Sequence, residues 1–174
     1  MARRIELVAN VSIVLLVIVL LAERFTTWTT PSTASEVTQN GDTYAVGEHL
    51  DLPGLDPSAS EATLVLVIRS TCPYCTASMP FYSSVSALRS ANPDRRLVAA
   101  SWETEEVTRH YLDHYHVVVD KILSVSPKSL HVPGTPTVIL INSKGMVEGE
   151  WVGKLSESHE QEIYRSFATR ATAR

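Results

Sequence analysis

The sequence predicts an α/β protein with a mixed central sheet and helices on both faces. In the first half, apolar runs typical of strands alternate with longer segments that suit helices, which indicates parallel βαβ winding. In the second half, two apolar segments flank Asn142-Ser143-Lys144-Gly145, a hairpin turn sequence, so the last two strands are predicted to be antiparallel. These two observations define the fold class.

The first half begins with the apolar run 62–69, which predicts a buried strand. A helix-compatible segment follows over 73–91, and the apolar stretch 96–101 predicts the next strand. The segment 103–116 is predicted as a helix, and the acids that begin at Glu103 suit its first turn, because the helix dipole favours negative charge there.

The second half begins with residues 117–119, which predict a short strand. The hairpin strands are predicted at 137–142 and 146–153, and a last helix at 157–169. Ahead of the domain, residues 46–57 mix apolar residues with Pro and Gly, which favours an edge strand or an extended lead-in segment.

The composition excludes several functions. The chain has 174 residues, 44% of them hydrophobic, which is enough for one domain with extensions. Its net charge of −4 gives no basic surface, so nucleic acid is not expected as a partner. None of the seven glycines stands in a phosphate-binding loop pattern.

The N-terminus predicts export and membrane attachment. Arg3 and Arg4 precede the run VSIVLLVIVLLA at 11–22, so we interpret 1–25 as a signal anchor and transmembrane helix. A cleaved signal or a buried core helix are the alternatives. The positive-inside rule then places the remaining chain outside the cytoplasm. Residues 26–43, rich in Thr and Ser, are predicted to be a flexible tether.

The chemistry is predicted from the only two cysteines, Cys72 and Cys75, which form a CxxC motif between a strand and a helix. A helix N-terminus stabilises the thiolate, which is the reactive form of cysteine, so Cys72 is the expected nucleophile. Cys75 is the expected resolving thiol, since no other cysteine is present. The redox pair needs no further cofactor.

Taken together, these features resemble the thioredoxin fold. Gly134-Thr135-Pro136-Thr137 is similar to the cis-proline loop of that family, and Pro80 matches the proline that kinks the active-site helix. With the N-terminal anchor, the lead-in at 46–50 and the C-x-x-C-x-x-x-x-Pro core, the chain looks most like the TlpA/ResA-like branch of extracytoplasmic thiol:disulfide oxidoreductases.

The resemblance implies a three-layer thioredoxin-like domain over 44–174. It implies that Pro136 is cis and faces the CxxC, and that Thr135 presents its backbone to an extended substrate peptide. Pro73 and Tyr74, a dipeptide typical of glutaredoxins, are expected to support the active site, and Pro73 suits the first turn of a helix.

The function that follows is a single-pass membrane oxidoreductase, with its catalytic domain on the periplasmic or extracellular side. The branch implies a reductant that acts on exported protein thiols and disulfides and receives electrons from a membrane or extracytoplasmic donor. Three positions depart from common family patterns. These are Leu66 in place of a buried Asp, Thr71 in place of Trp, and Ser78 in place of an acid.

The sequence is also compatible with three other kinds of protein: a metal-binding protein, a thiol peroxidase and a non-catalytic binding module. His110 and His114 stand at i and i+4 on a predicted helix, but no further ligand is nearby in the sequence, so no metal site is expected. A thiol peroxidase would need Thr three residues before its reactive cysteine, where Arg69 precedes Cys72. A non-catalytic binding module with the same fold is the main alternative.

Overall fold

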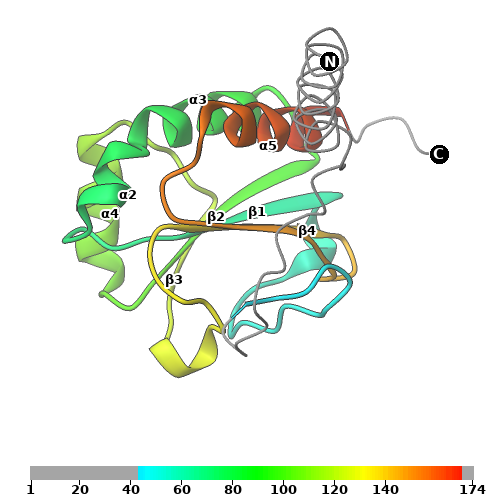
Figure 1. The fold of residues 1–174 in the computed structure, drawn as a ribbon, viewed down its shortest axis with the longest axis horizontal. Helices are drawn as coiled ribbons and strands as arrows, with labels where there is room; N and C mark the ends of the chain where they lie inside the picture. Colours follow the sequence, from blue (N-terminus) through cyan, green and yellow to red (C-terminus); the bar gives the residue numbers. More distant parts are fainter. Residues whose placement is uncertain (1–42, 170–174) are drawn as a thin grey trace, which may run out of the picture. The chain divides into compact units, whose positions relative to one another are not determined.

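The computed structural model describes residues 43–169 and contains a mixed sheet of five strands in the order β3-β2-β1-β4-β5 (Figure 1). The strands are β1 (Ala62–Val67), β2 (Arg95–Ser101), β3 (Lys121–Ser124), β4 (Thr137–Asn142) and β5 (Val147–Val152). The helices are α2 (Pro73–Ala77), α3 (Met79–Ser90), α4 (Glu105–His114) and α5 (Glu157–Thr169), with 3₁₀ turns η1 (Pro57–Ala59) and η2 (Pro127–Ser129). Strand β1 is parallel to β2 and antiparallel to β4. The predicted mixed sheet is confirmed.

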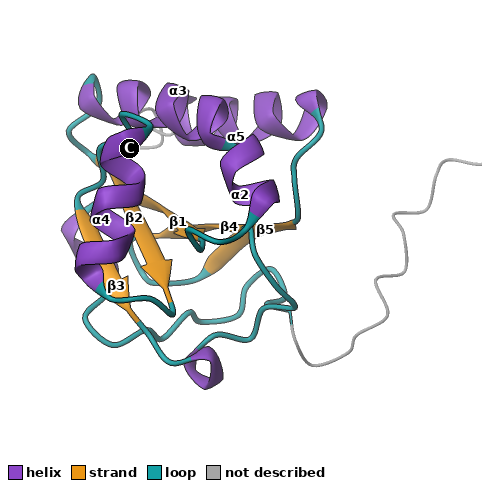
Figure 2. Cartoon of the chain, turned by 90° about the vertical axis from the view of Figure 1, so that its left-hand side faces the viewer, coloured by secondary structure: helices purple, strands orange, loops and turns teal. Residues whose placement is uncertain are grey.

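The two faces of the sheet are covered differently, and here the prediction of helices on both faces is wrong. Leu64 and Leu66 pack with side chains of α2, α3, α4 and α5, whereas Val65 and Val67 face the opposite side. That side is covered by residues 44–52, which include Leu50, and by the chain around η2. Figure 2 shows mainly loops on this side of the sheet. Consecutive right-handed crossovers from β1 to β2 to β3 move in one direction, so their helices fall on the same face.

The predicted helix 73–91 is divided into α2 and α3 at Ser78. Pro80 has no backbone N–H, so it cannot continue the α-helical hydrogen-bond pattern at this point. The hydroxyl of Ser78 is buried and donates to the carbonyl oxygen of Tyr74 at 2.9 Å. The break expected at Pro80 is present, and it leaves α2 as a short helix that begins at the CxxC motif.

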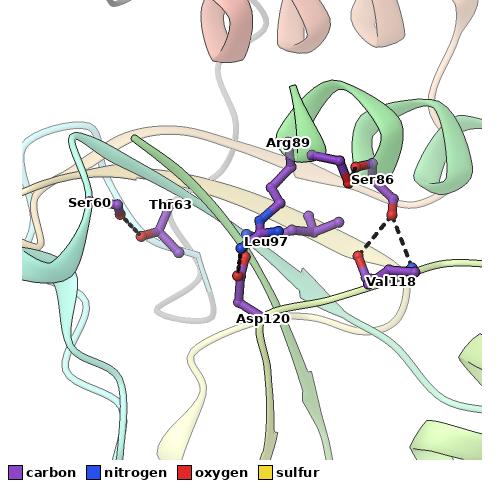
Figure 3. A network of polar contacts seen from close by, with 8 residues as sticks. Ser60, Thr63, Ser86, Arg89, Leu97, Val118 and Asp120 are labelled. Atoms are coloured by element: carbon purple, nitrogen blue, oxygen red, sulfur yellow. Dashed lines mark hydrogen bonds and ion pairs between the residues drawn. The ribbon is translucent and has the colours of Figure 1, made fainter. Parts of the chain in front are cut away.

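The strand predicted at 117–119 is absent, and β3 begins at Lys121 instead. Figure 3 shows the reason: the hydroxyl of Ser86 on α3 donates to the Val118 carbonyl (2.8 Å) and accepts from the Val118 N–H (3.0 Å). Asp120 accepts from the N–H of Leu97 at 2.9 Å and is ion-paired with Arg89. The Ser86 contacts use both backbone groups of Val118, so these are not available to a sheet, and the Asp120 carboxylate takes the place of a strand partner at the N–H of Leu97 on β2.

The hairpin has the predicted bounds in β4, and its turn has the expected chemistry. The side chain of Asn142 accepts from the Lys144 N–H at 2.9 Å, and Gly145 has a φ of +76°. A Cβ at Gly145 would lie 2.8 Å from the His49 ring, and the positive φ is itself strained for other residues, so glycine is favoured here. His49 forms an isolated antiparallel bridge with Met146, which confirms an extended lead-in segment rather than a full strand.

No helix within residues 43–169 is long and apolar enough to cross a membrane. The predicted anchor at 1–25 and all but the last residue of the predicted tether at 26–43 lie outside the described residues. The division into these segments stays a prediction.

Glu150, on β5, makes stability sensitive to pH. One carboxylate oxygen accepts from the Tyr44 N–H at 2.5 Å, and the other is buried without a hydrogen-bond partner. Burial, with a smaller contribution from Glu48, raises the pKa of Glu150 to about 7. A raised carboxyl pKa means that the folded state holds the proton more tightly. The contribution of Glu150 to stability is therefore fully present below the pKa that it has in the unfolded chain, and it is lost as pH rises through 7.

We expect Glu150→Gln to be more stable than the wild type at pH 8, by about 1–3 kcal/mol after allowance for partial exposure, and almost equal to it at pH 4. Urea unfolding at both pH values measures this difference. Glu162→Gln, an exposed change on α5, is the control and should be neutral at both. An equal effect of Glu150→Gln at pH 4 and pH 8 would contradict the assignment.

Candidate active site

The CxxC motif lies where the sequence places it, between β1 and a helix N-terminus. Cys72 is the N-cap of α2, and Pro73 occupies the first turn. The sulfur of Cys72 accepts from the N–H of Cys75 at 3.3 Å. Cys72 is partly exposed, whereas Cys75 is fully buried, and both are free thiols. One sulfur is therefore open to a substrate and the other is one turn deeper.

Residues 134–137 are far from the motif in the sequence but lie next to it in the fold. The thiol of Cys72 donates to the carbonyl of Thr135 at 3.2 Å, although the two residues are 63 positions apart. The Thr135–Pro136 peptide bond is cis. Pro136 is buried, while Thr135 is partly exposed beside the sulfur. The structure thus places Thr135 and the adjacent Pro136 beside the CxxC motif, the arrangement that the family resemblance implies.

The two thiols differ in acidity. Partial burial by itself would raise the pKa of Cys72, but hydrogen bonds from the side chain of Thr135, the Cys75 thiol and the backbone of Cys75 and Tyr74 outweigh it, and the pKa is lowered. Burial above all, together with the hydrogen bond to Cys72, raises the pKa of Cys75 to about 12. Since the thiolate is the nucleophile, Cys72 attacks first in any exchange reaction.

The other predicted site residues, Pro73, Tyr74 and Pro80, lie around the two cysteines or beyond them. Tyr74 projects from the motif with 63% of its surface exposed, and Pro73 is also exposed. Both can contact a partner that approaches Cys72. Pro80 lies in the first turn of α3, beyond the break at Ser78. A residue without a backbone N–H is tolerated in this first turn.

Two tyrosines, Tyr82 and Tyr111, interact electrostatically with Cys75, and the sequence analysis did not identify them. The hydroxyl of Tyr111 on α4 is hydrogen-bonded to Thr76 at 2.9 Å. Burial raises the pKa of Tyr111 to about 12 and also raises the pKa of Tyr82, and Cys75 contributes to both shifts. Leu66 occupies the strand position where the family resemblance would place a buried Asp.

Glu103 was predicted as a first-turn acid of a helix, and this is wrong. Helix α4 starts at Glu105, with Thr104 as its N-cap. Glu103 precedes the helix, and its carboxylate accepts from the N–H of Ser70 at 2.8 Å and from the Ser70 hydroxyl at 2.7 Å. The partner is 33 residues away, so no local pattern could have indicated this contact.

A groove lies on the α4 side of the motif. Its lining combines small polar groups from the CxxC region with apolar and imidazole side chains from α4. The lining residues are Ser70, Thr76, Glu106, Val107, His110, Tyr111, His114 and Tyr115. His110 and His114 are both exposed there, and within residues 43–169 no group of three or more His, Cys, Asp or Glu side chains could hold a metal ion.

The comparisons with known proteins agree with this fold. No protein-family model matches the sequence, and no curated protein matches it. Solved structures do match. A candidate thiol:disulfide interchange protein DsbE from Chlorobium tepidum superposes with a TM-score of 0.58 at 22% identity, over 72% of this chain and 99% of that one.

Two further structures are similar. A thiol-disulfide isomerase from Corynebacterium glutamicum has a TM-score of 0.54 at 16% identity, over 74% of this chain and 96% of that one. The thioredoxin domain of a thiol-disulfide oxidoreductase from Bacteroides vulgatus has a TM-score of 0.55 at 16% identity, over 73% and 100%. The described residues therefore form a thioredoxin fold, with a CxxC motif at the N-terminus of α2.

Proposed function

We propose that this protein is a thiol:disulfide oxidoreductase that reduces disulfides of exported proteins. The observation that carries the proposal is the asymmetry of the CxxC pair. Cys72 is accessible, has a lowered pKa and caps a helix, while Cys75 is buried and has a pKa raised to about 12. A structural disulfide does not require this difference between its two thiols.

The reaction follows from these properties. The Cys72 thiolate attacks one sulfur of a substrate disulfide, a Cys72–substrate S–S bond forms, and the other substrate sulfur leaves as a thiolate that takes up a proton. Cys75, after losing its proton to solvent, attacks Cys72. The Cys72–Cys75 disulfide forms, the second substrate thiolate leaves and is protonated, and two electrons have passed to the substrate.

The substrate chain is proposed to lie between two surfaces. On one side, the backbone of Thr135 is adjacent to the attacking sulfur of Cys72 and can pair with an extended peptide, next to the buried Pro136. On the other side, Tyr74 and the α4 groove offer apolar and aromatic contact.

The location and direction are parts of the same proposal. Arg3, Arg4 and the apolar run at 11–22 support a membrane anchor with the domain outside the cytoplasm, as in the TlpA/ResA-like branch. That resemblance also favours a reductant, which needs a membrane or extracytoplasmic electron donor to return Cys72–Cys75 to the dithiol.

The test is trapping by Cys75→Ser in the full-length protein expressed in a bacterium. Without the resolving thiol, mixed disulfides between Cys72 and exported proteins should accumulate and disappear on reduction with dithiothreitol. The matched control is the double variant Cys72→Ser/Cys75→Ser, which should trap nothing. If no exported protein is trapped and the intact protein has no disulfide reductase or oxidase activity, the proposal is wrong. A double variant that retains full biological activity would instead indicate a binding module.

A further inference from the structure

The loop that joins β1 to the CxxC motif is tied to the loop that follows β2. The carboxylate of Glu103 receives two hydrogen bonds from Ser70, one from the backbone N–H at 2.8 Å and one from the hydroxyl at 2.7 Å. Ser70 stands two residues before Cys72. Hydrogen bonds to a carboxylate are stronger than those between neutral groups, and a two-point contact also fixes orientation.

Glu103 is itself held in place. Its N–H donates to the hydroxyl of Ser101 at 3.2 Å, and Ser101 is fully buried at the end of β2. A second contact joins the same two loops, because the guanidinium of Arg69 lies 5.7 Å from the centre of the Trp102 ring. The loop before the cysteines is thus attached to the rigid sheet through Glu103.

The attachment reaches both sulfur-bearing residues through Arg69. The carbonyl of Arg69 accepts from the N–H of Cys72 at 3.2 Å. The sulfur of Cys72 in turn accepts from the N–H of Cys75 at 3.3 Å. The position of the Arg69 backbone therefore affects where the Cys72 sulfur lies relative to Cys75, and Ser70 is the next residue in the chain.

We propose that Glu103 is a positioning residue for the resolving step: by holding Ser70, it keeps the Arg69 carbonyl on the N–H of Cys72, and so keeps the Cys72 sulfur within reach of Cys75. The inference rests on the proposed function, because the resolving step is part of thiol–disulfide exchange. In that step Cys75 attacks Cys72, the Cys72–Cys75 bond forms, and the substrate thiolate leaves and takes up a proton. Glu103 touches neither sulfur and supplies no proton.

The test measures the two steps separately in the full-length protein. The reduced protein is mixed with oxidised glutathione, and acid-quenched samples are analysed by mass spectrometry for the Cys72–glutathione mixed disulfide. Alkylation of Cys72 by iodoacetamide reports the first thiol. We expect Glu103→Ala to lengthen the lifetime of the mixed disulfide about tenfold, the equivalent of one lost hydrogen bond to a charged group. Alkylation of Cys72 should change less than twofold.

Glu103→Gln separates position from charge. The glutamine oxygen can accept from the Ser70 N–H while its amide donates to the Ser70 hydroxyl, so the clamp is retained without the charge. We expect a mixed-disulfide lifetime within about twofold of the wild type. Glu105→Ala, which removes an exposed acid two residues away, is the matched control and should have no effect.

A folded Glu103→Ala variant with a wild-type lifetime would overturn the proposal, and so would a Glu103→Gln variant that behaves like Glu103→Ala. If Glu103→Ala does not fold, Ser70→Ala decides, because it removes only one of the two hydrogen bonds and should still lengthen the lifetime. A wild-type protein that forms no mixed disulfide at all would instead contradict the proposed function, and with it this step.

Discussion

The Cys72→Ser variant is expected to lose at least about 1,000-fold in the rate of disulfide reduction at pH 7, because no other group at the site can become the attacking thiolate. Cys75 remains in this variant, but it is fully buried and its pKa is raised to about 12, so almost none of it is ionised. The rate is measured with a small aromatic disulfide that releases a coloured thiol.

The difference in pKa between Cys72 and Cys75 should also be measurable in the wild type as a function of pH. Iodoacetamide should modify Cys72 with a midpoint below that of an ordinary thiol, while Cys75 should stay unmodified until strongly alkaline pH. Alanine in place of Tyr74, an exposed neighbour in the motif, serves as the control and should leave this profile nearly unchanged. Equal reaction of both cysteines near pH 8 would be incompatible with the assigned roles.

Much of the site could be predicted because its signals are local. A CxxC motif after an apolar strand specifies a helix N-terminus, and the structure places Cys72 at the N-cap. Strand β4 and helix α5 have the predicted bounds, 137–142 and 157–169, since both have clear apolar patterns and sharp flanking turns. The Thr135–Pro136 loop was anticipated only through the family resemblance.

What could not be predicted depends on contacts between distant residues. Residues 117–119 have a strand-like composition, but Ser86 on α3 forms hydrogen bonds with both backbone groups of Val118, so a neighbouring strand cannot. Glu103 was assigned to a helix because its partner Ser70 is remote in sequence. The placement of the helices on one face follows from the strand order, which no single segment encodes.

Arg95 is the clearest case of a residue whose role appears only in the fold. It shares one face of β2 with Leu97 and Ala99, because side chains alternate along a strand, and it is only 2% exposed. Its Nε donates to the carbonyl oxygen of Phe167 at 2.7 Å, in the last turn of α5. A cationic donor is favourable there, since the helix dipole is negative at its C-terminal end.

We therefore expect Arg95→Ala to lower the free energy of unfolding by about 3–5 kcal/mol, because it leaves a cavity and removes the partner of a buried carbonyl. Urea unfolding measures the change. Arg95→Met separates the two contributions: it restores most of the volume but not the hydrogen bond, so its loss should be smaller, about 1–3 kcal/mol.

The neighbouring residue supplies the control for this prediction. Arg96 is next to Arg95 on the strand but points to the other side, so Arg96→Ala should cost less than about 0.5 kcal/mol. If Arg95→Met were as stable as the wild type, the cost of burying the guanidinium would equal its gain from Phe167, and α5 would be held by packing of Ile163 and Phe167 alone.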